Sequence, residues 1–294
     1  MSESTSERIA KDAIGRYGVW SVGLRSEDPD RRDAIAEAAA ELEQLGYGTA
    51  WLGGSSAPRH ALPLLGATSR LVVGTSIQSI WQYDAADSAA QFSEVDSTYP
   101  GRFLLGLGVS HAKLAEQYKR PFSALVSYLD ELDKAGVPAG RRVLAALGPK
   151  TLELSGSRAL GAIPYLVTPE HTAEARDILG PEPLLAPELG VILEPDPARA
   201  RALARGHVAM YLQLPNYTNT WRRLGFTDAD LADGGSDRLI DALYAWGDPG
   251  RIRDRVESFL AAGADHVALQ VVEDDTSRDD LPREAWRRLA SILF

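Results

Sequence analysis

The sequence of 294 residues contains no cysteine. This absence excludes disulfide bonds, thiolate nucleophiles, zinc–thiolate sites and iron–sulfur clusters held by the chain. Histidine is scarce as well, and the five that occur are not spaced like a ligand cluster: His60, His111, His171, His207 and His266. We therefore expect no metal site.

Long apolar runs are also missing. No segment reaches the roughly 18 consecutive apolar residues that a membrane span needs, and the polar N-terminus lacks the apolar core of a signal peptide. We expect a cytoplasmic protein without a membrane segment. The sequence also lacks His-Glu-x-x-His, Gly-x-x-x-x-Gly-Lys-Ser/Thr and Gly-x-Ser-x-Gly, the motifs of zinc proteases, P-loop proteins and serine hydrolases.

Positive charge is in deficit, since the formal net charge is −10 at pH 7. Such a surface repels nucleic acid backbones and anionic membranes, so we expect neither as a partner. A single cofactor phosphate remains compatible with this charge, because backbone N–H groups at a helix start can bind it. The apolar share of 45% is sufficient for a large core.

The sequence does contain a regular alternation of short apolar runs with helical patterns. Eight runs are continuously apolar, as strands buried on both faces are: Gly18–Leu24, Thr49–Leu52, Leu71–Ile77, Phe103–Leu107, Val143–Leu147, Ala162–Leu166, Leu189–Leu193 and His266–Val272. Helical patterns cover residues 30–45, 58–68, 85–98, 121–135, 149–158, 169–179, 197–212 and 249–262, with a closing helix at 283–293.

Five of these helices have a clear start signal, a capping residue followed by proline at the first helical position. The pairs are Asp28-Pro29, Gly148-Pro149, Thr168-Pro169, Asp196-Pro197 and Asp248-Pro249. Eight β/α units predict a single closed (β/α)8 TIM-type barrel spanning residues 1–294, with an open doubly wound sheet as the alternative. Residues 214–246 are too long for a simple connection, so we expect extra helices there, with 215–221 as a candidate substrate lid.

In such a barrel, function resides after the carboxyl ends of the strands. The fourth strand ends in Gly106-Leu107-Gly108-Val109-Ser110-His111, and the fifth in Ala146-Leu147-Gly148-Pro149-Lys150. Gly148 and Pro149 leave free N–H groups at a helix start, where an anion can bind, and Lys150 can add a charge. The sixth strand repeats the pattern around Tyr165, although Glu170 favours plain capping of that helix.

The chain resembles the bacterial luciferase-like oxidoreductases, and especially their branch that uses the deazaflavin coenzyme F420. The most specific stretches are Leu71–Ala85, the run Tyr99-Pro100-Gly101-Arg102-Phe103-Leu104-Leu105-Gly106-Leu107-Gly108, Ala145–Leu154 and Gly161–His171. The resemblance implies a TIM-type barrel, a homodimer, and a cofactor whose ring lies in the barrel mouth. It also implies a non-proline cis peptide after the third strand, at Ser76-Ile77.

By the same matching, the cofactor is expected to contact residues after strands three to six: Ser76, Ile77, Gly108, Ser110, His111, Ala146, Gly148, Pro149, Lys150 and Tyr165. Sugar-oxidising relatives carry an acidic residue and a histidine after the second strand. Here that position reads Gly53-Gly54-Ser55-Ser56, so no catalytic base can be transferred. Candidate proton donors are Tyr83, His111, Ser55 and His60, and the candidate aromatic lining is Trp20, Trp51 and Trp81.

The sequence thus predicts an F420-dependent oxidoreductase that transfers a hydride to or from a small organic molecule. An FMN-dependent monooxygenase of the same fold is the first alternative. A non-catalytic flavin-binding barrel is the second, motivated by the missing acid–histidine pair.

Overall fold

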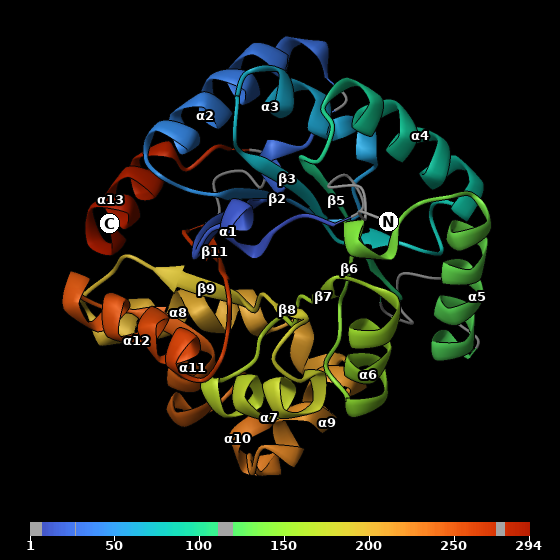
Figure 1. Cartoon of the computed structure of the whole chain (residues 1–294). Helices are drawn as coiled ribbons and strands as arrows, with labels where there is room; N and C mark the ends of the chain where they lie inside the picture. Colours follow the sequence, from blue (N-terminus) through green and yellow to red (C-terminus); the bar gives the residue numbers. More distant parts are fainter. Residues whose placement is uncertain (1–7, 27, 111–119, 275–279) are drawn as a thin grey trace.

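A computed structural model describes residues 8–26, 28–110, 120–274 and 280–294. The strands lie at the centre and the helices form an outer ring around them (Figure 1). No helix within the described ranges is long and apolar enough to span a bilayer. The arrangement is the α/β barrel that the alternation of strands and helices predicts.

Eleven strands of the described chain belong to one curved sheet. They are β1 (Tyr17–Ser21), β2 (Thr49–Gly53), β3 (Val72–Ser76), β4 (Gln78–Ser79), β5 (Phe103–Gly108), β6 (Arg142–Leu144), β7 (Gly161–Ala162), β8 (Leu184–Leu185), β9 (Glu188–Ile192), β10 (Tyr244–Trp246) and β11 (Val267–Val271). Neighbouring strands are parallel, in the order β10-β9-β11-β1-β2-β3-β5-β6-β7-β8, with β4 beside β5.

The sheet closes on itself through the stretch that holds β8 and β9. β8 pairs with β7, whereas β9, which begins three residues after β8 ends, pairs with β11. The amide of Glu188 also bonds Pro164 O at 2.8 Å, and Tyr165 forms an isolated bridge with Glu188. The predicted seventh strand therefore begins earlier than Leu189, and it joins the two halves of the barrel.

The helices agree closely with the predicted patterns. They are α1 (Lys11–Ile14), α2 (Arg32–Gln44), α3 (Leu62–Gly66), α4 (Ala85–Thr98), α5 (Pro121–Lys134), α6 (Pro149–Arg158), α7 (Pro169–Leu179), α8 (Pro197–Val208), α9 (Pro215–Arg223), α10 (Asp228–Leu231), α11 (Asp237–Leu243), α12 (Pro249–Ala261) and α13 (Arg283–Leu293). Short 3-10 turns lie at Val22–Leu24 (η1), Pro29–Arg31 (η2), Pro58–Ala61 (η3), Ala139–Arg141 (η5) and Tyr211–Gln213 (η6).

All five proline-started elements begin where predicted. The side chains of Asp28, Thr168, Asp196 and Asp248 each accept a backbone N–H of the first turn. Gly148 has no side chain to do this, so the N-terminus of α6 carries no side-chain cap. That difference leaves α6 available to bind an anion.

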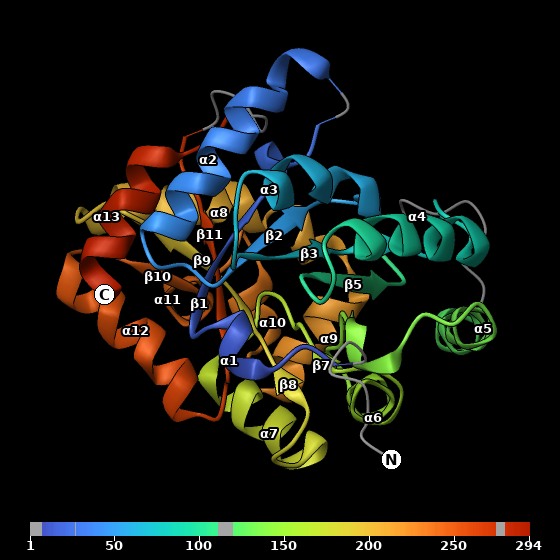
Figure 2. The same cartoon turned by 45° about the horizontal axis from the view of Figure 1, so that its top comes forward.

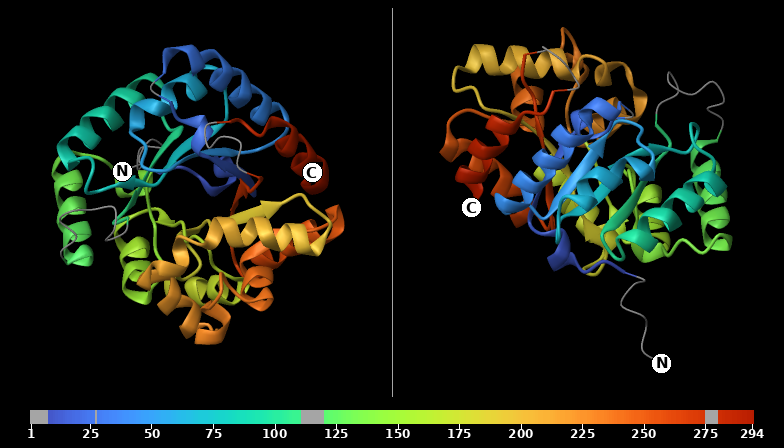
Figure 3. Two further views of the ribbon diagram at one scale, coloured as in Figure 1. Left: turned by 180° about the vertical axis from the view of Figure 1, so that it is seen from behind. Right: turned by 90° about the horizontal axis from the view of Figure 1, so that it is seen from above.

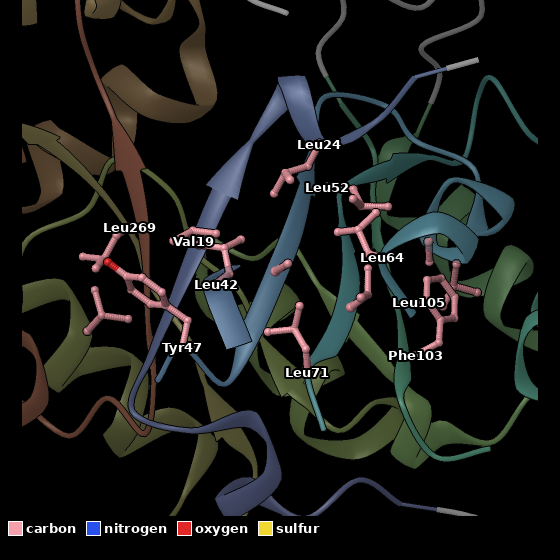
Figure 4. Close-up of a cluster of buried hydrophobic side chains, with 14 of the residues drawn as sticks. Val19, Leu24, Leu42, Tyr47, Leu52, Leu64, Leu71, Phe103, Leu105 and Leu269 are labelled. Atoms are coloured by element: carbon pink, nitrogen blue, oxygen red, sulfur yellow. The ribbon is translucent and has the colours of Figure 1, made fainter. Parts of the chain in front are cut away.

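The main core lies between the strands and the surrounding helices. Figure 4 shows Val19, Leu52 and Leu105 of the strands gathered with Leu42 of α2 and Leu64 of α3. The helices α2, α3 and α4 cover this side of the sheet (Figure 2). Because side chains alternate along a strand, the neighbouring residues face the barrel interior.

A separate apolar cluster fills the barrel interior toward the amino ends of the strands, which we call the lower interior. It includes Ile9, Ile14, Trp51, Val72 and Leu104. Ile14 belongs to α1, and its carbonyl accepts the Thr49 hydroxyl at the start of β2. The short helix α1 therefore closes the amino ends of the strands. The carboxyl ends remain as the mouth.

The extra segment is longer than residues 214–246. The chain leaves β9 at Ile192 and does not rejoin the helix ring until α12, so α8, α9, α10, α11 and β10 all belong to the segment. Its core, which includes Val208, Trp221, Leu243 and Trp246, is separate from the main core. In the right view of Figure 3 these gold and orange elements lie at the opposite end of the molecule from α1.

Several predicted strands prove too long. The first ends at Ser21 because the Ser21 hydroxyl accepts the amide of Gly23 and begins the turn η1. The fifth and sixth predicted strands shorten to β6 and β7 because the chain turns out of the sheet to form the loops before α6 and α7. The pairings of β4, β8 and β10 had no signal in the sequence pattern.

Candidate active site at the mouth of the barrel

The floor of the mouth consists of inward-facing residues of the strands, and Glu188 is the first residue of β9. Ser76 of β3, Glu188 of β9 and Gln270 of β11 are all at least nine-tenths buried. Trp20 of β1 is partly buried, and its indole N–H donates to Ser76 O at 3.0 Å. Polar groups from opposite sides of the barrel therefore meet at one level.

The peptide bond between Ser76 and Ile77 is cis, as the family resemblance implies. Ile77 lies beside Gly108 of β5, where an added Cβ would be 2.8 Å from the Ile77 Cδ1 atom. The Ser55 hydroxyl accepts the amide of Ser79 at 3.0 Å, which ties the loop after β2 to the same bulge. Thus three of the predicted cofactor residues, Ser76, Ile77 and Gly108, form one continuous surface.

The loop after β5 is only partly described. Ser110 has a left-handed backbone with φ 52°, which turns the chain away from the strand. His111 lies outside the described residues. Its predicted roles as a cofactor contact and as a proton donor remain predictions.

The loop after β6 brings Gly148, Pro149 and Lys150 to the rim of the mouth. An added Cβ at Gly148 would meet no atom of the described residues within 4 Å, and Lys150 is exposed. Ala146 is different, because its side chain packs between the sheet and helices α6 and α7. Only the backbone of Ala146 is available to a ligand in the mouth.

A second cation lies next to this helix start. The Arg223 guanidinium of α9 donates to Leu147 O at 3.0 Å, one residue before Gly148. Arg223 also lies 3.6 Å from the Glu174 carboxylate. The extra segment thus adds an arginine to the anion site that Gly148 and Lys150 indicate. No local sequence pattern predicts this contact.

The sixth loop does not offer a second anion site. The Thr168 side chain caps α7, and a hydrogen bond from Thr168 to the Glu170 carboxylate lowers the pKa of Glu170. The helix start therefore already has an acidic partner, as Glu170 suggested. His171 is buried and its Nε2 donates to Leu147 O at 2.9 Å, while burial lowers its pKa.

Tyr165 belongs to a polar network on the wall of the mouth. Its hydroxyl donates to Gln270 Oε1 at 2.7 Å and lies 3.2 Å from His207 Nε2. His207 Nδ1 in turn lies 2.8 Å from the Tyr244 hydroxyl. Burial raises the pKa of Tyr165 well above its usual range, so the phenol stays neutral.

Aromatic rings from the extra segment cover this network. The ring centroids of Tyr165 and Tyr211 are 5.3 Å apart, those of Tyr211 and Tyr217 are 5.1 Å apart, and both pairs are edge to face. Tyr217 belongs to α9, within the predicted lid 215–221. The segment therefore closes one side of the mouth. It consists of the extra helices expected for residues 214–246, and it includes residues 215–221, the candidate substrate lid.

Glu188 is the main feature that sequence reasoning missed. Burial raises the pKa of its carboxyl group well above the usual range, and a hydrogen bond with the Ser76 side chain only partly opposes this shift. The available signal was a single acidic residue, directly before the apolar run Leu189–Leu193. The predicted strand begins at Leu189, one residue after Glu188, so the pattern does not indicate that Glu188 faces inward.

The other predicted side chains have mixed outcomes. His60 is buried rather than on a helix surface, and its Nδ1 accepts the amide of Ala57. Trp51 does not line the substrate side, because it is fully buried in the lower interior cluster. The indole of Trp81 donates to Val109 O at 2.6 Å, which supports the loop after β5. Tyr83 is partly exposed.

A cavity of about 320 Å³ lies between α11, β10 and α12, away from this floor. Its cations Arg251 and Arg255 are balanced by the carboxylates Asp241 and Asp254. It has no excess charge to favour an anion. Among the described residues no cluster of three or more histidine, aspartate or glutamate side chains is arranged to hold a metal.

Comparison with known proteins supports the family resemblance that the sequence shows. The family model described as luciferase-like monooxygenase matches residues 16–135, which run from β1 through α5. The resemblance inferred from the sequence is therefore confirmed over this region. No curated protein matches the chain.

Solved structures extend the likeness to nearly the whole chain. An F420-dependent secondary alcohol dehydrogenase with an F420–acetone adduct has a TM-score of 0.69 at 15% identity, covering 95% of this chain and 99% of that one. An F420-dependent tetrahydromethanopterin reductase from Methanopyrus kandleri has a TM-score of 0.64 at 15% identity, covering 95% and 98%.

A third structure uses a different cofactor. The oxygenating constituent of 3,6-diketocamphane monooxygenase from Pseudomonas putida, a type II Baeyer-Villiger monooxygenase in complex with FMN, has a TM-score of 0.63. Its identity is 15%, and the match covers 94% of this chain and 96% of that one. At these identities the likeness establishes the fold, while the family match supports an enzyme of the oxidoreductase class.

Proposed function

We propose that this chain is an F420-dependent oxidoreductase that transfers a hydride between the deazaflavin and a small organic molecule bound in the barrel mouth. The observation that carries the proposal is the start of α6 at Gly148, which has no side-chain cap and no described atom within 4 Å of an added Cβ, and which is flanked by Lys150 and Arg223. Backbone N–H groups and two cations suit the phosphate of a cofactor tail.

The rest of the mouth fits a flat ring. On this surface Gly108 has no side chain and the Ile77 side chain lies over it, while the Trp20 indole donates to Ser76 O. When bound, F420 supplies a carbon that gives or accepts a hydride. The chain contributes orientation, exclusion of water by the tyrosines of the extra segment, and a proton source.

Two F420-dependent enzymes among the structural neighbours support this cofactor, as does the F420-branch resemblance of the loop sequences. FMN is the second candidate, favoured by the description of the matching family and by the FMN-bound neighbour. Both cofactors carry a phosphate and a tricyclic ring, so the same residues serve either one. The homodimer remains a proposal from the resemblance, and analytical ultracentrifugation tests it.

The test is turnover with purified protein. Reduced F420 is mixed with a panel of ketones, aldehydes, imines and activated alkenes, and its oxidation is followed by absorbance under anaerobic conditions. We expect oxidation that requires both the protein and one class of acceptor. Cofactor binding without oxidation across the panel supports the non-catalytic barrel, and oxygen-dependent turnover of reduced FMN supports the monooxygenase.

A further inference from the structure

Glu188 is the one buried acidic side chain among the described residues, with 5% of its surface exposed. Its position on β9 is fixed on both sides, by the bridge to Tyr165 and by the pairing with Ala268 of β11. The next residue, Leu189, packs in the outer core, so the carboxyl group of Glu188 faces the barrel interior.

The hydrogen bonds of this carboxyl group are incomplete. The Ser76 hydroxyl bonds the group, but the Oε1 atom has no hydrogen-bond partner. Buried polar atoms are almost always paired, because leaving one unpaired costs about 1–3 kcal/mol. Several other buried atoms of the described residues are also unpaired, but Glu188 Oε1 is in the barrel interior, where a bound ligand can provide its partner.

The neighbouring polar groups are bonded to one another instead. The Tyr165 hydroxyl donates to Gln270, and the Tyr244 hydroxyl pairs with His207. Burial is the largest cause of the raised pKa values of Tyr165 and Tyr217, and the nearby Glu188 carboxyl group adds to both shifts. Among the described residues, the titratable groups around Glu188 are thus four phenols and one imidazole. They are Tyr165 of the loop after β7, His207 of α8, Tyr211 of η6, Tyr217 of α9 and Tyr244 of β10.

Burial raises the pKa of Glu188 well above its usual range, and no arginine or lysine of the described chain opposes this shift, so the site favours the protonated carboxyl group. In this form Ser76 donates to one oxygen, and the other carries an O–H that needs an acceptor. A carbonyl oxygen is such an acceptor. An ionised carboxylate substrate is a poor fit, because a negative charge in this buried floor has no cation beside it.

We propose that Glu188 is the proton donor of the reaction and that the substrate is an uncharged carbonyl compound whose oxygen accepts the free O–H of Glu188. This inference rests on the proposed function. In the reducing direction, the carbonyl carbon accepts a hydride from reduced deazaflavin, and the C=O π pair takes the proton of Glu188. The product is an alcohol, the deazaflavin is oxidised by two electrons, and the Glu188 carboxylate regains a proton from water.

A purely structural role explains the site less well. Glutamine has the same shape, accepts the same bond from Ser76, and avoids burying an acid. A carboxylic acid held neutral in a cleft is instead a common arrangement for a general acid. The variant Glu188→Gln therefore separates the two roles, since it keeps the shape and removes the proton.

The first experiment measures the protonation state in the cofactor-free protein. Glutamate carboxyl carbons are labelled with 13C, and the Glu188 resonance is assigned by its absence in Glu188→Gln. We expect this resonance to titrate well above the ordinary glutamate range. Titration of Glu188 near the ordinary glutamate range overturns the proposal.

The second experiment measures turnover of ketones and aldehydes with reduced F420, after F420 binding has been established by fluorescence. We expect Glu188→Gln to bind F420 with unchanged affinity but to reduce kcat about 10²- to 10⁴-fold. The wild-type kcat falls as pH rises through the pKa of Glu188, and Glu188→Asp retains part of this pH dependence. The control Glu153→Gln behaves as wild type.

The outcomes are separable. Loss of F420 binding in the wild-type protein means that the proposed function is wrong, whatever the Glu188 titration shows. Normal F420 binding with equal kcat and equal pH profile in wild type and Glu188→Gln overturns only the proton-donor assignment. F420 binding without turnover of any uncharged carbonyl compound also contradicts it.

Discussion

The indole Nε1 of Trp51 lies 3.0 Å from Nε2 of His266, deep in the barrel interior. Because an indole N–H can only donate, His266 Nε2 must be the acceptor, and the ring proton is on Nδ1. Nδ1 then donates to Gly15 O at 2.7 Å. Both ring nitrogens are satisfied in the neutral form, and burial, the largest cause, lowers the pKa of His266 to about 4.

This pair predicts acid sensitivity. The unfolded chain protonates His266 near pH 6.5, whereas the folded protein keeps it neutral down to about pH 4, so stability is lost as pH falls through this window. The loss reaches about 3 kcal/mol at most. Urea unfolding at pH 7, 6 and 5 measures it, and His266→Asn is expected to flatten this part of the profile. An unchanged slope in the variant contradicts the assignment.

The Gly-Arg-Phe run has a structural role that its family pattern does not reveal. The Arg102 guanidinium donates to the carbonyls of Leu65, Thr68 and Leu71, which joins the end of α3 to the start of β3. We expect Arg102→Met to lower the free energy of unfolding by about 2–4 kcal/mol while cofactor affinity is unchanged. Arg70→Met, which removes a nearby exposed arginine, is the control, and equal unfolding midpoints for the two variants contradict this role.

Glycine at position 148 is predicted to serve the ligand rather than the fold. Its φ of −109° is ordinary, and an added Cβ meets no described atom within 4 Å, so a larger side chain is tolerated. We expect Gly148→Leu to keep its Tm within a few degrees and to lose cofactor binding, because the side chain covers the start of α6. Gly206→Leu on α8 is the matched control. Normal binding by Gly148→Leu shows that the assignment of this loop is wrong.

Arg223 is predicted to contribute charge to the same anion site. Replacement by glutamine removes one charge-assisted contact, so cofactor affinity is expected to fall about tenfold, and its dependence on salt is expected to weaken. Fluorescence titrations at two ionic strengths measure both effects. The neighbouring Arg222 pairs with Asp228 instead, and Arg222→Gln serves as the control. Equal effects of the two replacements contradict a specific role.

Glu188 also has a consequence for stability that needs no cofactor. Its pKa is raised in the folded protein, so the folded state retains a proton that the unfolded chain loses, and stability falls as pH rises above the ordinary glutamate range. We expect Glu188→Gln to remove this loss and to gain stability relative to wild type as pH rises above the ordinary glutamate range. Thermal unfolding across this range measures the difference, and parallel curves refute the shift.

The sequence predicted the barrel because its signals are local. Proline after a capping residue marks helix starts, and buried parallel strands are apolar throughout, so the bounds of α4, α6, α7 and α13 agree with the expected ranges. The family pattern predicted the cis peptide at Ser76-Ile77, which the structure has, and it predicted Ser76, Ile77 and Gly108 as cofactor contacts, which stays a prediction.

What the sequence could not predict depends on contacts between distant residues. Arg223 reaches Leu147 across 76 positions, and Tyr165 reaches Gln270 across 105. Glu188 can be recognised as a candidate site residue only from the strand register, which places it inside the barrel beside Ser76. Trp51 is a candidate for the aromatic lining from the sequence alone, but its inward side chain packs one layer lower, against His266.

The most direct test of the central claim is equilibrium binding of F420 and of FMN to the purified wild-type protein, followed by fluorescence. The proposed function predicts saturable F420 binding, weaker FMN binding, and loss of F420 binding in Gly148→Leu but not in Gly206→Leu. Tight FMN binding without F420 binding, or no binding of either cofactor, would contradict it.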